Sequence, residues 1–177
     1  MELAITNIDQ LDFKKQYSYA DYLKWQFSER VELIKGYLHK MSPAPARKHQ
    51  DLTGNLHGYF WNYLKQKPCK VYAAPFDVRF PRKNTDSETN TFTVLQPDIC
   101  VVCNPDILDE KGCNGAPDLI IEVLSPGNSN KEMKLKFDIY EESGVKEYWI
   151  VQPEYQMVLV YILYENCKFI NSSNYSI

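Results

Sequence analysis

The segment from residue 119 to residue 151 restricts the possible folds more than any other part of the chain. An apolar run at 119–124 (LIIEVL) is followed by a helical pattern that extends to about Glu142, and then by a run rich in Val, Ile and Trp at 147–151. Both apolar runs are typical of buried strands. Two strands joined by a helix in so few residues favour a crossover connection and therefore at least one parallel strand pair.

The ends of that helix also have recognisable signals. Ser129 followed by Glu132 predicts an N-terminal capping box, and Gly144 predicts a left-handed C-terminal cap. The remaining pattern predicts a short helix at 18–27 capped by Ser18 and Asp21, a hairpin at 31–41 with its turn at Lys35-Gly36, a helix at 46–66, extended structure at 71–80, a strand at 99–102 and an antiparallel strand at 157–164. The polar residues 81–91 lack periodicity and predict a mobile loop.

This order of elements predicts an α/β fold, with helices flanking a mixed sheet and with an N-terminal helix and β-hairpin. The 177 residues suffice for one substantial core, so we expect a single domain over 1–177. No stretch approaches the roughly 18 apolar residues of a membrane span, and the N-terminus lacks a signal-peptide apolar region. These features predict a soluble, cytoplasmic protein.

Cysteine content and charge narrow the possible functions. The five cysteines are irregularly spaced, which favours reduced thiols over a disulfide framework. Cys100 and Cys103 have the spacing of a redox or zinc motif, but on a strand they would face opposite sides, so core positions are the better interpretation. The net charge of −3 lacks the basic excess of an indiscriminate nucleic-acid binder, so any phosphate binding must be local or assisted by a metal.

Two acidic residues lie where strands are expected. Asp98 follows a proline at the entrance to the strand 99–102, and Glu122 lies inside the apolar run 119–124. Burying an ionised carboxylate among apolar neighbours costs several kcal/mol unless a cation or hydrogen-bond donors compensate it. Glu122 could instead form an ion pair or face solvent on an edge strand. Acids on successive strands can also converge on a divalent cation, which prefers oxygen ligands.

Asp118 competes for the same role, because it also follows a proline. It lies four residues before Glu122, a separation of roughly 13 Å along a strand at about 3.3 Å per residue. The two side chains cannot share one ion without a bend. We therefore assign Asp118 to strand entry or loop hydrogen bonding.

Four segments together resemble a bacterial family classed as restriction endonucleases of largely unknown function. They are VELIKGYLHKMSPAPARKHQ, QPDICVV, GAPDLIIEVLSPGN and KFDIYEESGVKEYWIVQP, and the resemblance covers nearly the whole chain. It implies the restriction-endonuclease-like fold of the PD-(D/E)XK superfamily, two metal-binding acids in the central strands, and hydrolysis of phosphodiester bonds. Asp98 matches the Pro-Asp position and Glu122 matches the second acid.

The lysine of the parent motif stands two residues after the second acid, where this chain has Leu124. In the resembled family the lysine has moved to the following helix, and Lys136 matches it. Glu132, Lys136 and Tyr140 share one helical stripe, so Lys136 could lean towards the strand ends. On spacing alone a solvated helix face, shared with Lys131 and Lys134, is the favoured interpretation of Lys136, because most helical lysines are surface residues, and the resemblance reverses that preference. Glu132 replaces a common Asp of the family, so its role stays open.

Two further positions match the resembled family. Glu32 could add a carboxylate to the site, or simply face outward by strand alternation with Leu33 inward. His49 opens the long helix, where a lone histidine is more often a cap or polar contact than a ligand.

These residues lead to the hypothesis of a Mg²⁺- or Mn²⁺-dependent endonuclease that hydrolyses DNA. Asp98, Glu122, the Val123 carbonyl and Glu32 would bind the ion, and Lys136 would complete the catalytic set. Candidates for contact with the DNA backbone are Arg47, Lys48, Arg79, Arg82 and Lys83. The alternatives are an inactive nuclease fold that binds DNA or protein, and a metal phosphoesterase acting on nucleotides or RNA. A homodimer is expected only by analogy, since two sites cut two strands.

Overall fold

The computed structural model describes residues 4–41, 46–81, 87–127 and 129–176, and a six-stranded central sheet organises them. Its strand order is β12-β11-β10-β9-β6-β3. The strands β9 and β10 are parallel, and the other neighbours are antiparallel. The strand bounds are β3 Lys70–Ala73, β6 Ile99–Val102, β9 Leu119–Val123, β10 Glu147–Gln152, β11 Met157–Leu163 and β12 Phe169–Ser176.

A second, smaller sheet has the order β2-β1-β5-β4-β8-β7. The pair β4 and β8 is parallel, and the other neighbours are antiparallel. Its strands are β1 Val31–Ile34, β2 Tyr37–Lys40, β4 Val78–Arg79, β5 Val94–Leu95, β7 Leu108–Asp109 and β8 Gly112–Asn114. The predicted hairpin at 31–41 is confirmed as β1 and β2. Both of its turn residues, Lys35 and Gly36, have the positive φ that such a two-residue turn requires.

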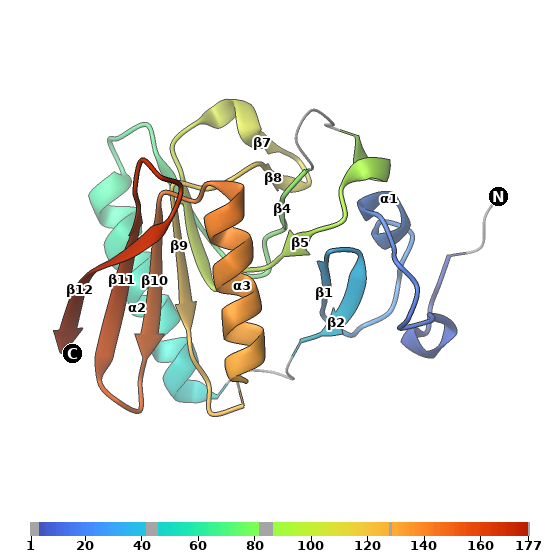
Figure 1. Ribbon diagram of the computed structural model, residues 1–177, viewed down its shortest axis with the longest axis horizontal. Coiled ribbons are helices and arrows are strands. Elements are labelled where there is room, and N and C mark those ends of the chain that lie inside the picture. Colours follow the sequence, from blue (N-terminus) through green and yellow to red (C-terminus); the bar gives the residue numbers. More distant parts are fainter. Residues whose placement is uncertain (1–3, 42–45, 82–86, 128, 177) are drawn as a thin grey trace.

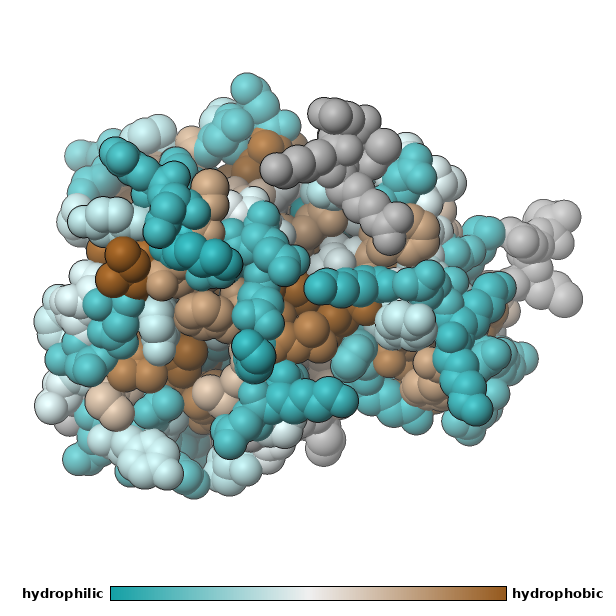
Figure 2. Space-filling model, viewed as in Figure 1, coloured by the Kyte–Doolittle hydropathy of each residue, from teal (hydrophilic) through white to brown (hydrophobic). Residues whose placement is uncertain are grey.

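Two long helices cover opposite faces of the central sheet, α2 (Arg47–Leu64) behind and α3 (Asn130–Ser143) in front in the view of Figure 1. Figure 2 shows hydrophilic side chains across the face that carries α3, with apolar surface between them. Short helical turns complete the set: α1 Tyr19–Tyr22 and the 3-10 turns Ile8–Gln10, Glu88–Asn90 and Pro105–Ile107. Within the described ranges no helix is long and apolar enough to cross a membrane.

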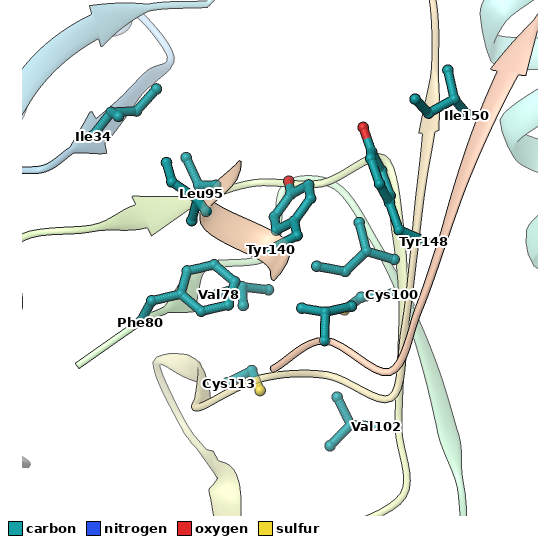
Figure 3. Packing of buried hydrophobic residues seen from close by; sticks show 13 residues of the cluster. Ile34, Val78, Phe80, Leu95, Cys100, Val102, Cys113, Tyr140, Tyr148 and Ile150 are labelled. Carbon is teal, nitrogen blue, oxygen red and sulfur yellow. The ribbon is translucent and has the colours of Figure 1, made fainter. Parts of the chain in front are cut away.

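Alternation along β9 divides the core into two layers. Ile121 and Val123 pack in the cluster that contains Leu64 of α2, whereas Ile120 packs with Tyr140 of α3. The second layer also takes in residues of the smaller sheet, so α3 lies where both sheets meet. Figure 3 shows this layer, with Tyr140 between Leu95, Val78 and Phe80 on one side and Tyr148 on the other.

The crossover predicted from 119–151 is confirmed, because β9, α3 and β10 follow one another and the two strands pair in parallel. Gly144 ends α3 in the left-handed conformation with φ of 88°, as expected. Ser129 caps the start of the helix by accepting a hydrogen bond from the Glu132 N–H. The polar stretch 81–91 lies partly outside the described residues, and its described part contains the 3-10 turn Glu88–Asn90.

The first helix is shorter than the predicted 18–27 and ends at Tyr22. Its capping box is present: Ser18 accepts from the Asp21 N–H, and the Asp21 carboxylate accepts from the Ser18 N–H. The aromatic residues beyond Tyr22 belong instead to a cluster in which Trp25 packs against Tyr17, Tyr22 and Phe27. The aromatic residues after Tyr22 are therefore explained by their packing in this cluster, and they do not extend the helix.

The expectation of reduced cysteines is wrong for one pair, because Cys69 and Cys103 form a disulfide. They lie one residue beyond the ladder pair of Lys70 and Val102, at adjacent ends of β3 and β6. Only the register of these strands brings them together, so sequence spacing could not reveal the bond. Cys100 and Cys113 are buried free thiols, which agrees with the core interpretation of Cys100.

A glycine at the junction of β4 and β8 gives a test of this packing. Gly112 has φ of +126°, and an added Cβ would lie 2.3 Å from the Asp77 carbonyl oxygen. We expect Gly112→Ala to lower the free energy of unfolding by about 2 kcal/mol or more, measured in urea. Gly54→Ala is the control, because nothing lies within 4 Å of its added Cβ in α2. It should stabilise by up to about 1 kcal/mol, and equal losses in both variants would contradict the packing argument.

Candidate functional site

Asp98 and Glu122 face each other across two neighbouring antiparallel strands. The last ladder pair of β6 and β9 is Ile99 with Ile121, so the next step of the register sets Asp98 opposite Glu122. Directly opposed residues of an antiparallel pair have Cβ atoms roughly 5 Å apart. The two carboxylates that the sequence selected are therefore brought together at the entrance to β6.

Asp98 is held by donors from a strand and from a helix. Its Oδ2 accepts a hydrogen bond of 2.8 Å from the Val123 N–H and lies 3.2 Å from His49 Nε2 of α2. The hydrogen bond to Asp98 raises the pKa of His49, and the Val123 backbone carbonyl adds to that rise. Thr53 Oγ1 lies 3.4 Å from the other ring nitrogen of His49. His49 is thus part of this constellation as a polar partner of Asp98.

Glu122 is buried, with 9% of its surface exposed, and α3 supplies its partners. Its Oε1 accepts from the Tyr140 hydroxyl at 2.7 Å and from Lys136 Nζ at 3.1 Å. Lys136 and Tyr140 are four residues apart on one stripe of α3, which places both side chains over β9. The solvated interpretation of Lys136 is excluded, because its side chain is 10% exposed.

Glu32 of β1 completes the buried charges. Its Oε1 accepts from Lys136 Nζ at 3.0 Å and from the Gln96 N–H at 2.9 Å. All four residues of β1 are buried, so the outward orientation that strand alternation allowed for Glu32 does not occur. β1 belongs to the smaller sheet, and its Glu32 side chain contacts Lys136 of α3 instead of solvent. One lysine therefore bridges carboxylates from both sheets.

Burial and neighbouring charges shift the pKa values of this cluster. Burial raises the pKa of Glu122 to about 7; Lys136 opposes that rise, Asp98 and Glu32 add to it, and the Tyr140 hydrogen bond opposes it. Burial by itself would lower the pKa of Lys136, but the two glutamates outweigh it and raise the pKa above its ordinary value. Lys136 is accordingly an ammonium at any physiological pH.

Each acid of the facing pair has one oxygen committed to protein donors. Donors in the described part of the chain contact Asp98 Oδ2 and Glu122 Oε1. The other two oxygens, Asp98 Oδ1 and Glu122 Oε2, accept no hydrogen bond from these described residues. Over the described ranges no group of three or more His, Cys, Asp and Glu side chains is arranged to hold a metal ion. Two carboxylates nevertheless fit Mg²⁺, which keeps several waters and often uses only one or two carboxylates.

Comparison with known proteins places this chain in a family. A family model described as "Uma2: Putative restriction endonuclease" matches residues 19–171. The chain belongs to this Uma2 family. A structure titled as a "putative nuclease belonging to DUF820" from Anabaena variabilis has a TM-score of 0.62 and 23% identity, covering 82% of this chain and 79% of that one. That likeness shows a nuclease-like fold, as the sequence resemblance implied.

An uncharacterized protein of Synechocystis sp. is 23% identical over 133 residues. The match covers 74% of this chain and 65% of the relative, so the chain spans about two thirds of the relative's length. This relative therefore adds no activity to the family description.

Several residues considered from the sequence lie outside the constellation. Asp118 has the structural role assigned to it: its Oδ2 accepts from the Cys103 N–H, and its Oδ1 lies 2.6 Å from Lys146 Nζ. Glu132 contributes its backbone N–H to the cap of α3. Lys134 is exposed and pairs with Asp138, as its solvated interpretation requires.

The basic residues proposed to contact DNA have different surroundings. Arg79 is buried, pairs with Asp109 at 2.6 Å and lies over the Tyr19 ring, so it is wrong as a backbone contact. The sequence could not predict that Arg79 would be buried beside Asp109 and Tyr19. Arg47 is 88% exposed beside Asp51, and Lys48 donates to the Pro153 carbonyl. Arg82 and Lys83 lie outside the described residues.

Two residues that contact Glu122 or Glu32, Tyr140 and Gln96, were missed by the sequence analysis as candidate site residues. Tyr140 appeared only as part of the helical stripe with Lys136, although a tyrosine four residues after the lysine was the signal that could have found it. Gln96 donates its N–H to Glu32 and its side-chain amide to Asp77, while its carbonyl accepts from Arg30. The link through its backbone N–H had no sequence signal, because it depends on β1 lying beside β5.

Removing the central cation gives a test of the cluster. We expect Lys136→Met to lower the free energy of unfolding by about 3–5 kcal/mol at neutral pH, because two buried carboxylates lose their counter-ion. The loss should shrink as pH falls and the carboxylates become protonated, measured by urea unfolding. Lys134→Met is the control and should change stability by less than about 0.5 kcal/mol. Similar values for both variants would exclude a buried ion cluster.

Proposed function

We propose that this chain hydrolyses DNA phosphodiester bonds with the help of a divalent cation. The observation that carries the proposal is the pair of facing carboxylates, Asp98 and Glu122, each held at one oxygen with the other oxygen unengaged by described donors. The same chemistry is supported by the family description, which names a restriction endonuclease, and by the nuclease-like fold.

Charge balance supports a divalent ion. Asp98, Glu122 and Glu32 bring three negative charges when ionised, and Lys136 brings one positive charge; His49 adds none when it is deprotonated. The two negative charges that remain match Mg²⁺ or Mn²⁺. Asp98 and Glu122 would hold the ion, with the Val123 carbonyl and Glu32 as candidate additional oxygens. Such an ion supplies Lewis-acid polarisation of a phosphoryl oxygen and a bound water of lowered pKa.

The protein side chains have separate tasks in this proposal. Lys136 keeps its charge and lies 3.1 Å from Glu122, so it could stabilise negative charge that develops on a phosphate held near that carboxylate by the ion. Tyr140 and the Val123 N–H fix the orientations of Glu122 and Asp98 before substrate arrives. Preorganised groups of this kind avoid a reorganisation cost during the reaction.

A second candidate is a nuclease fold that binds DNA or protein without cleaving it. Leu124 favours it, because this position of the parent motif carries the lysine. The position of Lys136 favours hydrolysis, since the ammonium reaches the same carboxylate from α3. A metal phosphoesterase acting on nucleotides or RNA would use the same residues, so a panel of DNA, RNA and nucleotide substrates distinguishes it.

A homodimer and a cytoplasmic location are further parts of the proposal. Cutting both strands of a duplex calls for two active sites. In the cytoplasm the Cys69–Cys103 disulfide would meet the reductants that keep most thiols of that compartment reduced.

Isosteric variants test the assignment of the two acids. We expect Asp98→Asn and Glu122→Gln to lower the rate of Mn²⁺-dependent cleavage of plasmid DNA by at least about 100-fold, since each removes a metal-binding charge. Asp118→Asn is the control, because Asp118 binds the Cys103 N–H and Lys146 rather than the facing pair. Cleavage that persists in both site variants would refute the assignment.

The pH dependence of Mn²⁺ binding provides a second test. Burial raises the pKa of Glu122 to about 7, so below that pH the carboxyl is largely protonated and must lose its proton to bind a cation. We expect affinity, measured by calorimetry, to rise as pH increases through about 7 and then to level off. Proton release should accompany binding on the acid side. Affinity that is constant across this range would contradict a role for Glu122 as ligand.

A further inference from the structure

A pocket of about 170 Å³ opens beside the candidate site, where β9 ends and α3 begins. Its walls include Leu124, Met133, Gln152 and Tyr155. Figure 1 shows that the segment after β9, the start of α3 and the turn between β10 and β11 lie at the same lower end of the molecule. The volume is below the roughly 300–1,000 Å³ typical of pockets for drug-sized ligands, so it suits one flat ring system.

Strand and helix periodicity connect this pocket to the buried cluster. Leu124 is two residues after Glu122, hence on the same face of the strand and roughly 7 Å further along it. Met133 is three residues before Lys136, hence on the same stripe of α3. Leu124 and Met133 therefore form the apolar continuation of the contact between Glu122 and Lys136. Because the lysine comes from α3, position 124 is free to carry an apolar wall.

The lining indicates which part of a nucleic acid the pocket suits. It contains no lysine or arginine among the described residues, and Glu154 adds a negative charge, so a phosphate is disfavoured there. Apolar walls and the Gln152 amide suit the face and the edge of a nucleobase. Tyr155 is 73% exposed at the rim, and base–aromatic stacking contributes about 1–3 kcal/mol per base.

Basic side chains for the strand backbone lie on the adjacent helix end. Lys48 donates a hydrogen bond to the carbonyl of Pro153, a residue that lines the pocket. The side chain of Arg47, which precedes Lys48 in the sequence, is 88% exposed. His49, the next residue of α2, contacts Asp98. The start of α2 thus extends from the facing carboxylates to the pocket. The separation of roughly 7 Å between Glu122 and Leu124 equals about two base steps of 3.4 Å along one strand.

We propose that this pocket receives a nucleobase of the substrate strand, turned out of the stack within about two nucleotides of the phosphate at Asp98 and Glu122, with Tyr155 stacked on it. The proposal rests on the proposed function, because it takes that phosphate position as given. It assigns Tyr155 to substrate binding and gives position 124 a role in place of the motif lysine.

The experiment measures binding rather than cleavage. The probes are a fluorescein-labelled oligodeoxythymidine and a fully abasic strand of equal length, titrated with the full chain at one low salt concentration without divalent cations. Tyr155→Ala should weaken binding of the thymidine strand by roughly 5- to 150-fold, the range that stacking energies give. It should leave binding of the abasic strand unchanged, because that strand keeps its phosphates but has no base. Tyr155→Trp should retain the wild-type affinity.

Tyr59→Ala is the matched control, because Tyr59 is 76% exposed and lies nearly three turns, roughly 15 Å at about 1.5 Å per residue, further along α2 than His49. It should bind both strands as the wild type does. The proposal is overturned if Tyr155→Ala binds the thymidine strand normally, or if it loses equal affinity for both strands. Calorimetry with Mn²⁺ reports separately on the proposed hydrolysis. A wild-type chain that binds no Mn²⁺ but keeps the Tyr155 effect would refute hydrolysis and support the pocket.

Discussion

The rest of the structure depends on the buried contact of Lys136 with Glu32 and Glu122. It joins α3 to a strand of each sheet, at distances of 3.0 and 3.1 Å. Burying three charges costs several kcal/mol per ion, which is offset only where the geometry is good and further hydrogen bonds are made. The Tyr140 hydroxyl and the Gln96 N–H supply those bonds. Few placements of α3 between the sheets satisfy all of them, so the cluster fixes how the two sheets meet.

Sheet register provides the second constraint, because it converts two distant acids into neighbours. The ladder between β6 and β9 sets Asp98 opposite Glu122, and the Val123 N–H then holds Asp98 from the facing strand. A slip of one residue would turn Glu122 to the other face of the sheet, away from Lys136. The apolar residues that alternate along β9 oppose such a slip, because they would leave their core layers. The same strand register therefore determines both the packing of the core and the geometry of the site.

The sequence was sufficient wherever the signal was local and strong. An acid inside the apolar run 119–124 drew attention to Glu122, and the glycine that follows the helical pattern predicted the C-terminal cap at Gly144. Lys136 was selected by the family resemblance, because its spacing alone favoured a solvated helix face. Features that depend on how separate segments pair were beyond it. The burial of Glu32 requires the second sheet, and the bond between Cys69 and Cys103 requires the register of two strands. The strand β12 was missed because its residues FINSSNYS are mostly polar and exposed, and pairing with β11 forms it.

The distribution of cations indicates what would hold a nucleic acid on this acidic chain. Arg79 and Lys136 are both buried and paired within the protein, so neither adds to a basic surface. The facing carboxylates would repel a phosphate unless a divalent ion lay between them. The exposed cations at the start of α2, Arg47 and Lys48, are too few for the strong, indiscriminate attraction of a basic protein. Affinity would then come mainly from the ion and from contacts to bases, which makes an apolar pocket beside the carboxylates more important than in a basic nuclease.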